Sequence, residues 1–377
     1  MEPVKVNAEM LGTQTPVGNG TALSQLDLNN KIIQFELLSY DKHQTLEGLQ
    51  IEPVAMTYIR HLEQLGLKVL NVTTVIALQK GYGNARCFFV WDRSNNLVSQ
   101  EYVRTLQKLA PYTTFTVAFD EESSNFYCHK PGREKKMLPL QTYLQGKRSC
   151  VTIPFPTIQQ SVRDTERQMA VFWGRLHGAF ETIDNFKNEV LLNRVLKNFV
   201  IQPFFSWLWD LDRIVLYKNQ YWEIELKHKY PFRRGAKAPL KFGINVGQAK
   251  LVRDLGKIGI RTLHLILVKP DWSKHSDPGY LFNRRDNYNR VLLIGTELTT
   301  TKTEALLNQK KQESDETTSF TGASKNRFLE IPATDFHVLG SYQTPPEEVA
   351  ENIKSLLDGV SLVKVTDELL ESCRINE

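Results

Sequence analysis

The order of hydrophobic and polar positions divides the first 150 residues into strands with two helices between them. Residues 53–66 carry apolar side chains at helical intervals between Pro53 and Gly66, which are typical first and last residues of a helix. A second helix is expected at 99–110, with Ser99 as its cap. Short runs rich in β-branched and aromatic side chains predict strands at 31–38, 67–78, 85–92, 113–120 and 124–130. We therefore expect an α+β domain over residues 31–150, preceded by a flexible arm at 1–30.

Beyond residue 150 the pattern turns to long helices followed by strands. Apolar side chains recur at helical spacing through residues 161–186 and are expected in the core; they are Met169, Phe172, Trp173, Leu176, Phe180 and Ile183. The elements expected after them are a helix at 187–199, a β-hairpin at 211–227, a helix at 242–259 and strands at 261–270 and 289–298. A polar stretch predicts a flexible loop at 301–327, and 328–377 is expected to pack a strand and a helix on the second domain, 156–300.

The hairpin carries charged side chains where a buried sheet would have apolar ones. Because side chains alternate between the two faces of a strand, Glu223, Glu225 and Lys227 share one face of the second strand. Antiparallel pairing can bring Asp212, on the first strand, beside Glu225 and Lys227. Two carboxylates are costly to bury together unless they bind a cation, and their oxygens suit Mg²⁺. The pattern favours a magnesium site for phosphodiester hydrolysis, in which Lys227 stabilises the transition state.

These residues resemble the PD-(D/E)xK nuclease superfamily, whose core has an aspartate on one strand and Glu-x-Lys on the next. Asp212 matches the aspartate, and Glu225-Leu226-Lys227 matches the Glu-x-Lys thirteen residues on. The order and spacing look most like the NERD and Holliday-junction-resolvase-like branches, and the resemblance covers residues 160–300. It implies an α/β fold of the restriction-endonuclease type, with a mixed central sheet flanked by helices, preceded by the separate α+β domain. It also implies an endonuclease that uses Mg²⁺, with Mn²⁺ as a substitute.

The resemblance extends to two further side chains and leaves two choices open. Glu189 matches an acid that many members carry on the preceding helix, where it would act as a ligand or assist the attacking water. Gln248 matches a glutamine that several branches carry on the following helix. Asp210 and Glu223 are alternatives to the aspartate and the glutamate of the motif as metal ligands.

The positive charge of the chain is concentrated directly behind the motif. The formal net charge is +5, whereas residues 225–261 hold ten basic and two acidic side chains, a net +8, which leaves the rest at −3. The side chains expected to bind nucleic-acid phosphates are Lys229, Arg233, Arg234, Lys237, Lys241 and Lys250. Tyr230 and Phe232 lie among them and can stack on a base. DNA is the expected substrate, and RNA stays open because nothing in the sequence reads a 2′-hydroxyl.

Composition also indicates the redox state and the cellular location that we expect for this chain. The four cysteines have no CxxC pair or other zinc-ligand spacing, so we expect them to be reduced. No apolar run approaches the roughly 20 residues that cross a bilayer, and the polar start does not read as a signal peptide, so the expected location is cytoplasmic. The habits of the superfamily suggest phage defence, restriction or a mobile element. The N-terminal domain is expected to bind a DNA feature, a partner protein, a signalling ligand or a second copy of the chain.

A second hypothesis keeps the same fold without catalysis. The basic face would bind nucleic acid, and the N-terminal domain would recruit a partner. The presence of Asp212, Glu225 and Lys227 together favours the enzyme, because an inactive descendant would be expected to lose at least one of them. The two hypotheses are separated by comparing metal binding of the intact protein with that of an Asp212→Asn/Glu225→Gln variant. Equally weak binding by both would favour the non-catalytic module.

Overall fold

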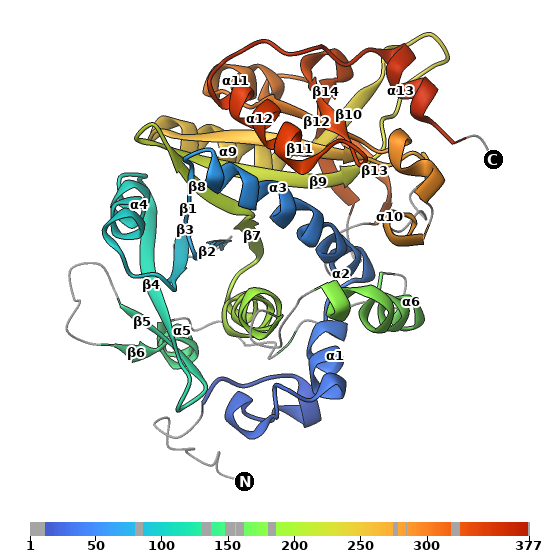
Figure 1. Ribbon diagram of the computed structural model, residues 1–377. Coiled ribbons are helices and arrows are strands. Elements are labelled where there is room, and N and C mark those ends of the chain that lie inside the picture. Colours follow the sequence, from blue (N-terminus) through green and yellow to red (C-terminus); the bar gives the residue numbers. More distant parts are fainter. Residues whose placement is uncertain are drawn as a thin grey trace. The chain divides into compact units, whose positions relative to one another are not determined.

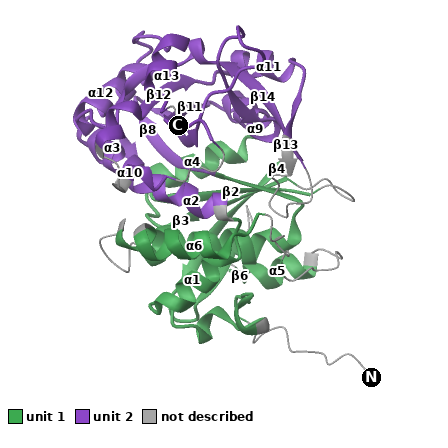
Figure 2. Ribbon diagram, turned by 90° about the vertical axis from the view of Figure 1, so that its right-hand side faces the viewer, with its two compact units in different colours: residues 1–43, 71–210 green, residues 44–70, 211–377 purple. Residues whose placement is uncertain are grey.

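The computed structural model describes residues 12–79, 86–129, 137–147, 155, 162–179, 186–273, 278–283, 285–317 and 325–375. The chain forms two compact units (Figure 2). Unit 1 comprises Met1–His43 and Asn71–Asp210, and unit 2 comprises Gln44–Leu70 and Leu211–Glu377. The expected domains therefore have to be corrected, because residues 44–70 fold with the C-terminal half and residues 156–210 with the N-terminal half. Local hydrophobic spacing does not record such pairing of distant segments.

Unit 1 is built on a six-stranded sheet with the order β6-β5-β4-β3-β2-β7. The strands are β2 Val72–Leu78, β3 Arg86–Asp92, β4 Tyr112–Asp120, β5 Asn125–His129, β6 Leu138–Pro139 and β7 Trp207–Leu211. Helix α4, Leu97–Gln107, joins the parallel strands β3 and β4. Its N-cap is Asn96, and Ser99 completes a capping box from inside the first turn, so the predicted cap was three residues late.

The remaining helices of unit 1 correct two predictions. They are α1 Lys31–Ser39, α5 Leu140–Lys147, α6 Thr165–Val171 and α8 Leu192–Val195, and turns of π-helix at Phe172–Leu176, Lys187–Leu191 and Leu196–Ile201 extend α6 and α8. The strand predicted at 31–38 is helix α1, because Asn30 caps Ile32 and the buried Gln34, Leu37 and Leu38 follow helical spacing. Met169 and Trp173, predicted in the core, are 43 % and 46 % exposed, whereas Phe172 and Leu176 are buried. Phe180 and Ile183 lie outside the described residues.

The described part of the predicted flexible arm, residues 12–30, packs on unit 1. The side chain of Leu23 is buried, and the Thr13 hydroxyl donates to Asn125 Oδ1 of β5 at 2.7 Å. The Asn, Gly and Thr residues of this segment form short turns held by such hydrogen bonds, which its composition did not reveal.

Unit 2 contains a six-stranded mixed sheet with the order β1-β8-β9-β11-β12-β15. The strands are β1 Lys68–Val69, β8 Arg213–Tyr217, β9 Gln220–Lys229, β11 Ile260–Val268, β12 Leu292–Glu297 and β15 His337–Ser341. β9 and β11 are parallel, and the other neighbouring pairs are antiparallel. Helix α9, Val246–Lys257, lies between β9 and β11 in the chain and makes the crossover that parallel strands need.

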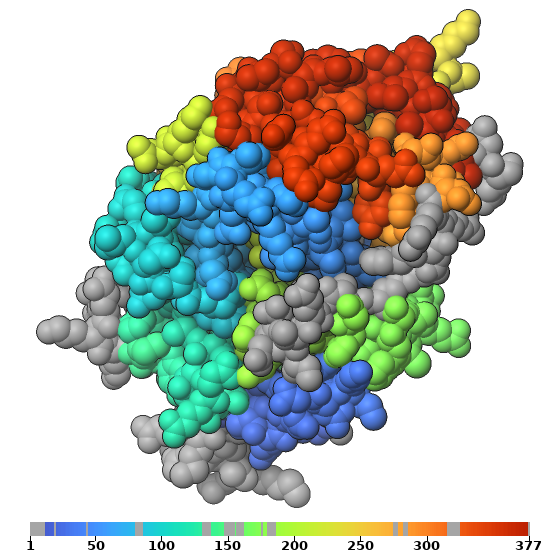
Figure 3. Space-filling view, viewed as in Figure 1, coloured from blue at the N-terminus to red at the C-terminus, as the bar shows by residue number. Residues whose placement is uncertain are grey.

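Other elements of unit 2 cover both faces of this sheet (Figure 1), and each face has its own hydrophobic core. On one face, Trp222, Ile224 and Leu265 pack against α3, Glu52–Gln64, and α12, Pro346–Leu357. These two helices lie side by side at the surface, blue and red in Figure 3. On the other face, Ile266 and Ile294 pack against α9 and a three-stranded sheet of the order β10-β14-β13.

The segment predicted as a loop at 301–327 contains regular structure instead. It holds most of α11, Thr300–Leu307, as well as β13, Gln312–Thr317, and the start of β14, Lys325–Pro332, which pairs with β10, Lys241–Asn245. Thr299 caps α11, and the sequence of β13 is polar because its described part is an exposed edge strand. Unit 2 also contains α10 Tyr280–Asn283, α13 Asp367–Cys373 and, from Gln44 on, α2 His43–Gly48. Across the described ranges, none of the helices has the length and apolar character that crossing a bilayer requires.

Candidate active site

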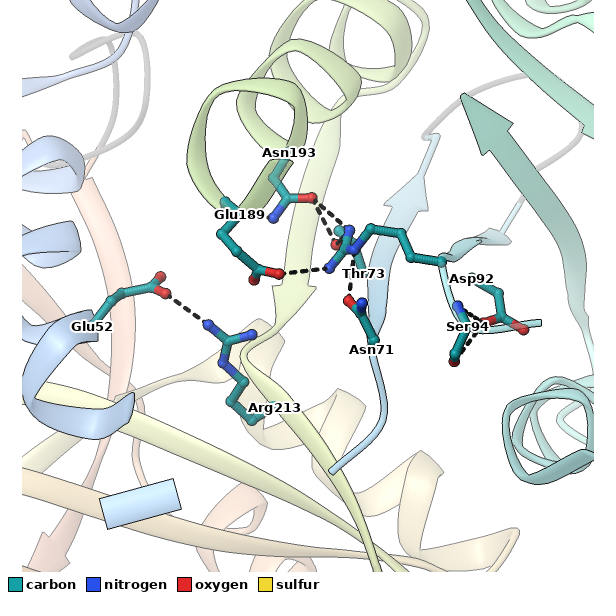
Figure 4. A network of polar contacts seen from close by, with 9 residues as sticks. Glu52, Asn71, Thr73, Asp92, Ser94, Glu189, Asn193 and Arg213 are labelled. Atoms are coloured by element: carbon teal, nitrogen blue, oxygen red, sulfur yellow. Dashed lines mark hydrogen bonds and ion pairs between the residues drawn. The ribbon is translucent and has the colours of Figure 1, made fainter. Parts of the chain in front are cut away.

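A tight hairpin positions the charged residues of unit 2. Lys218 and Asn219 adopt positive φ angles of 47° and 60°, as both central residues of a two-residue hairpin turn do. The turn sets the register of β8 and β9, in which Ile214 lies opposite Glu223. At the other end of β8, Arg213 donates to Glu52 of α3 at 3.3 Å, which ties the strand to that helix (Figure 4).

The side chains of Asp212, Glu225 and Lys227 meet beside the hairpin. Lys227 Nζ lies 3.5 Å from Asp212 Oδ2 and also contacts Glu225 Oε1. The Asp212 carboxylate is held in addition by the backbone N–H of Leu226 at 3.1 Å. Gln248, in the first turn of α9, donates from Nε2 to Glu225 Oε1 at 2.5 Å. The structure thus groups four of the five residues expected to be catalytic into one cluster.

The fifth, Glu189, belongs to unit 1. Its carboxylate lies 3.9 Å from the guanidinium of Arg93, which also donates to Asn71 at 2.7 Å and to Thr73 at 2.9 Å (Figure 4). Asn193, four residues further along the helix, donates to the backbone carbonyl of Glu189 at 2.6 Å. This network anchors the helix to the sheet of unit 1. A role of Glu189 in metal binding stays a prediction.

The two alternative ligands have different surroundings. Asp210 pairs with Lys197 of unit 1 at 2.7 Å, so Asp212 is the aspartate of the cluster in unit 2. Glu223 is buried on the same face as Glu225, and its carboxylate accepts from the Thr262 hydroxyl at 2.8 Å. Burial raises the pKa of Glu223 well above its ordinary value, and the nearby charge of Glu225 raises it further. Glu225, which contacts Lys227, is therefore favoured over Glu223 as the glutamate of the cluster.

Most of the predicted basic surface is engaged by other parts of unit 2. Arg233 contacts Glu371 of α13, and Arg234 and Lys241 both bind Glu330 of β14 at 2.8 Å. Lys229 is not exposed for phosphate binding: its ammonium donates to the backbone carbonyl of Gly243, and burial, with the charge of Lys227 second, lowers its pKa to about 8. Among the six predicted residues, the two exposed ones without an ion pair to the described part of the chain are Lys237 and Lys250.

Three polar residues near the cluster were missed or misjudged. His228 lies on the opposite face of β9 and binds the hydroxyl of Tyr280 at 2.5 Å. Burial lowers the pKa of His228 well below its ordinary value. Thr262 and His264 lie on β11 opposite Glu223 and Glu225. Their signal in the sequence was available, because Thr262 and His264 are polar residues at alternate positions of a strand that is apolar from Leu263 to Val268 apart from His264.

The cluster fits Mg²⁺ as an open site. Among the residues that the structure describes, no three His, Cys, Asp or Glu side chains are grouped so that they could hold a metal ion. Asp212 and Glu225 both reach the same ammonium, so their negative charge converges at one place. Mg²⁺ commonly takes one or two carboxylates and completes its shell with water and phosphate oxygens. Two carboxylates are enough for such a site.

No family model, curated protein or solved structure shows a significant match to this chain. We therefore infer its function from the geometry of unit 2.

Proposed function

We propose that this protein is a metal-dependent nuclease that hydrolyses phosphodiester bonds in DNA. The observation that carries the proposal is the convergence of the Asp212 and Glu225 carboxylates on the ammonium of Lys227 at the hairpin. The hairpin, α9 and the parallel strand β11 follow in the order expected for a restriction-endonuclease-like core, which is part of the proposal.

Each side chain of the cluster would have a separate role in hydrolysis. Mg²⁺, when bound, would supply an activated water and neutralise charge on the phosphate. Asp212 and Glu225 would hold the ion, and the N–H of Leu226 and the amide of Gln248 fix the directions of the two carboxylates. The side chain of Lys227 is 33 % exposed, so its ammonium can donate to a phosphate oxygen as negative charge develops there.

The basic residues supply a binding surface of limited extent. Lys237 and Lys250 are exposed and available to phosphates. Arg234 and Lys241 can exchange the carboxylate of Glu330 for a phosphate, because a phosphodiester offers the same anionic oxygens. Affinity for nucleic acid should then fall steeply with salt concentration.

The test is cleavage of supercoiled plasmid, linear duplex, single-stranded DNA and RNA, each with Mg²⁺, Mn²⁺ or EDTA. Lys227→Ala is compared with Lys218→Ala, a change in the turn of the same hairpin, where Lys218 binds Asp358. We expect metal-dependent cleavage that Lys218→Ala keeps and Lys227→Ala loses. Full activity of Lys227→Ala would refute the site. Binding without cleavage in every condition would favour a non-catalytic nucleic-acid-binding module.

A further inference from the structure

His264 is a buried side chain with unused hydrogen-bonding groups in the middle of the unit 2 sheet. It is 0 % exposed, and neither ring nitrogen has a hydrogen-bond partner among the described residues. Nearly all buried polar groups bind another polar group, a water molecule or an ion, because an unpaired one is destabilising. We therefore expect the ring of His264 to have a hydrogen-bonding partner.

The sheet register shows on which side this partner lies. On β12, Thr296 lies opposite His264, but its hydroxyl donates to the carbonyl of Asp335 at 2.9 Å and accepts from Lys302 Nζ at 3.0 Å. The ring of Phe336 lies 6.2 Å away and offers no hydrogen-bonding group. On β9, the residue opposite His264 is Glu225. Paired residues of neighbouring strands point to the same face, so the imidazole and this carboxylate stand next to each other.

The charges around His264 determine its protonation. Burial lowers its pKa well below the ordinary value, and the ammonium groups of Lys229, Lys227 and Lys302 lower it further. The ring is therefore neutral and carries one N–H donor and one acceptor nitrogen. Since neither ring nitrogen binds a described group directly, a water molecule that accepts from the ring N–H and donates to the Glu225 carboxylate would bridge the two side chains.

We propose that His264 is a positioning residue of the site, which holds an ordered water molecule against the carboxylate of Glu225. Gln248 holds this carboxylate from α9, and His264 holds it from within the sheet. The consequence for metal binding rests on the proposed function: a carboxylate fixed from two sides keeps its orientation when the cation binds. The water contact itself does not depend on that function.

The first experiment therefore uses the metal-free, full-length protein with ¹⁵N-labelled histidine. Loss of one signal in His264→Gln assigns the ring. We expect a single neutral tautomer whose ring-nitrogen resonance moves in Glu225→Gln. The same resonance should keep its position in Asp358→Asn, a control that changes a carboxylate elsewhere in unit 2, where it binds Lys218. A His264 resonance that is the same in Glu225→Gln as in the unmodified protein would overturn the proposal.

The second experiment measures Mn²⁺ binding by calorimetry. His264→Phe keeps the ring volume but removes both nitrogens, and we expect about tenfold weaker binding, as for other residues that orient a metal ligand. His264→Gln keeps a donor and an acceptor and should restore most of the affinity. Ile294→Val, a change in the same core, controls for packing. Equal affinity of His264→Phe and the unmodified protein would contradict the role of His264.

The two experiments test the water contact of His264 and the proposed metal site separately. If the unmodified protein bound no Mn²⁺, the proposed metal site would fail, and the nitrogen resonances would still decide whether His264 and Glu225 share a water molecule.

Discussion

Replacing Lys227 with methionine removes the ammonium that contacts both carboxylates of the cluster. At 3.5 Å its attraction to Asp212 is about 5 kcal/mol for an effective dielectric constant of 20 and about 1 kcal/mol in bulk water. The two side chains are 33 % and 32 % exposed, so solvent screening moves the value toward the lower figure. Glu225 is 2 % exposed. Removing the partner of a fully buried charge costs about 3–5 kcal/mol, and the 33 % exposure of the Lys227 side chain lowers this figure. We expect a loss of about 2–4 kcal/mol in the free energy of unfolding at pH 8.

The assay is urea unfolding at pH 8 in EDTA, followed by tryptophan fluorescence. Lys218→Met is the matched control, because its ion pair with Asp358 lies in the turn of the same hairpin and Lys218 is 68 % exposed. Mg²⁺ should restore stability to Lys227→Met by about 2.7 kcal/mol at a hundred times its dissociation constant.

Two results would refute this reasoning. If Lys227→Met were no less stable than Lys218→Met at pH 8, the carboxylates would not depend on this ammonium for their charge balance. If Mg²⁺ left the stability of Lys227→Met unchanged, Asp212 and Glu225 would not form a cation site.

Neighbouring side chains give three further predictions. Gln248→Leu removes the amide that holds Glu225 and should weaken Mg²⁺ binding about 10–100-fold by calorimetry with the fold retained; equal affinity would contradict its role. The raised pKa of Glu223 means that it binds more protons folded than unfolded, so its contribution to stability is lost as pH rises from the ordinary carboxyl pKa toward the folded one. In Glu223→Gln the free energy of unfolding should no longer show this fall between pH 5 and 9. The same pH dependence in the variant and the unmodified protein would contradict the prediction. Trp222→Ala should cost about 3–5 kcal/mol in urea unfolding, because Trp222 is 1 % exposed, whereas a cost under 1 kcal/mol would show that this core face is loosely packed.

The sequence determined the local geometry of the hairpin. Alternation along β9 placed Glu223, Glu225 and Lys227 on one face and Trp222 and Ile224 on the other, and the register of β8 and β9 agrees. This could be predicted because the period of two is a property of the extended backbone and needs no distant partner. Most of the strands were predictable for the same reason. Helices α3, α4 and α12 were predictable from the helical period of about 3.6 residues, which is equally local.

Only the tertiary structure decided which residues share a unit and what each charge meets. Glu189, assigned to the cluster from its place on a helix, belongs to unit 1 beside Arg93, and Arg234 and Lys241 of the basic stretch are bound by Glu330 from 89 or more residues away. The sequence did not distinguish His264 from other strand residues. Only the pairing of β11 with β9 places it opposite Glu225. Spacing along a chain cannot show such contacts, because burial and electrostatic interaction depend on which distant segments pack together.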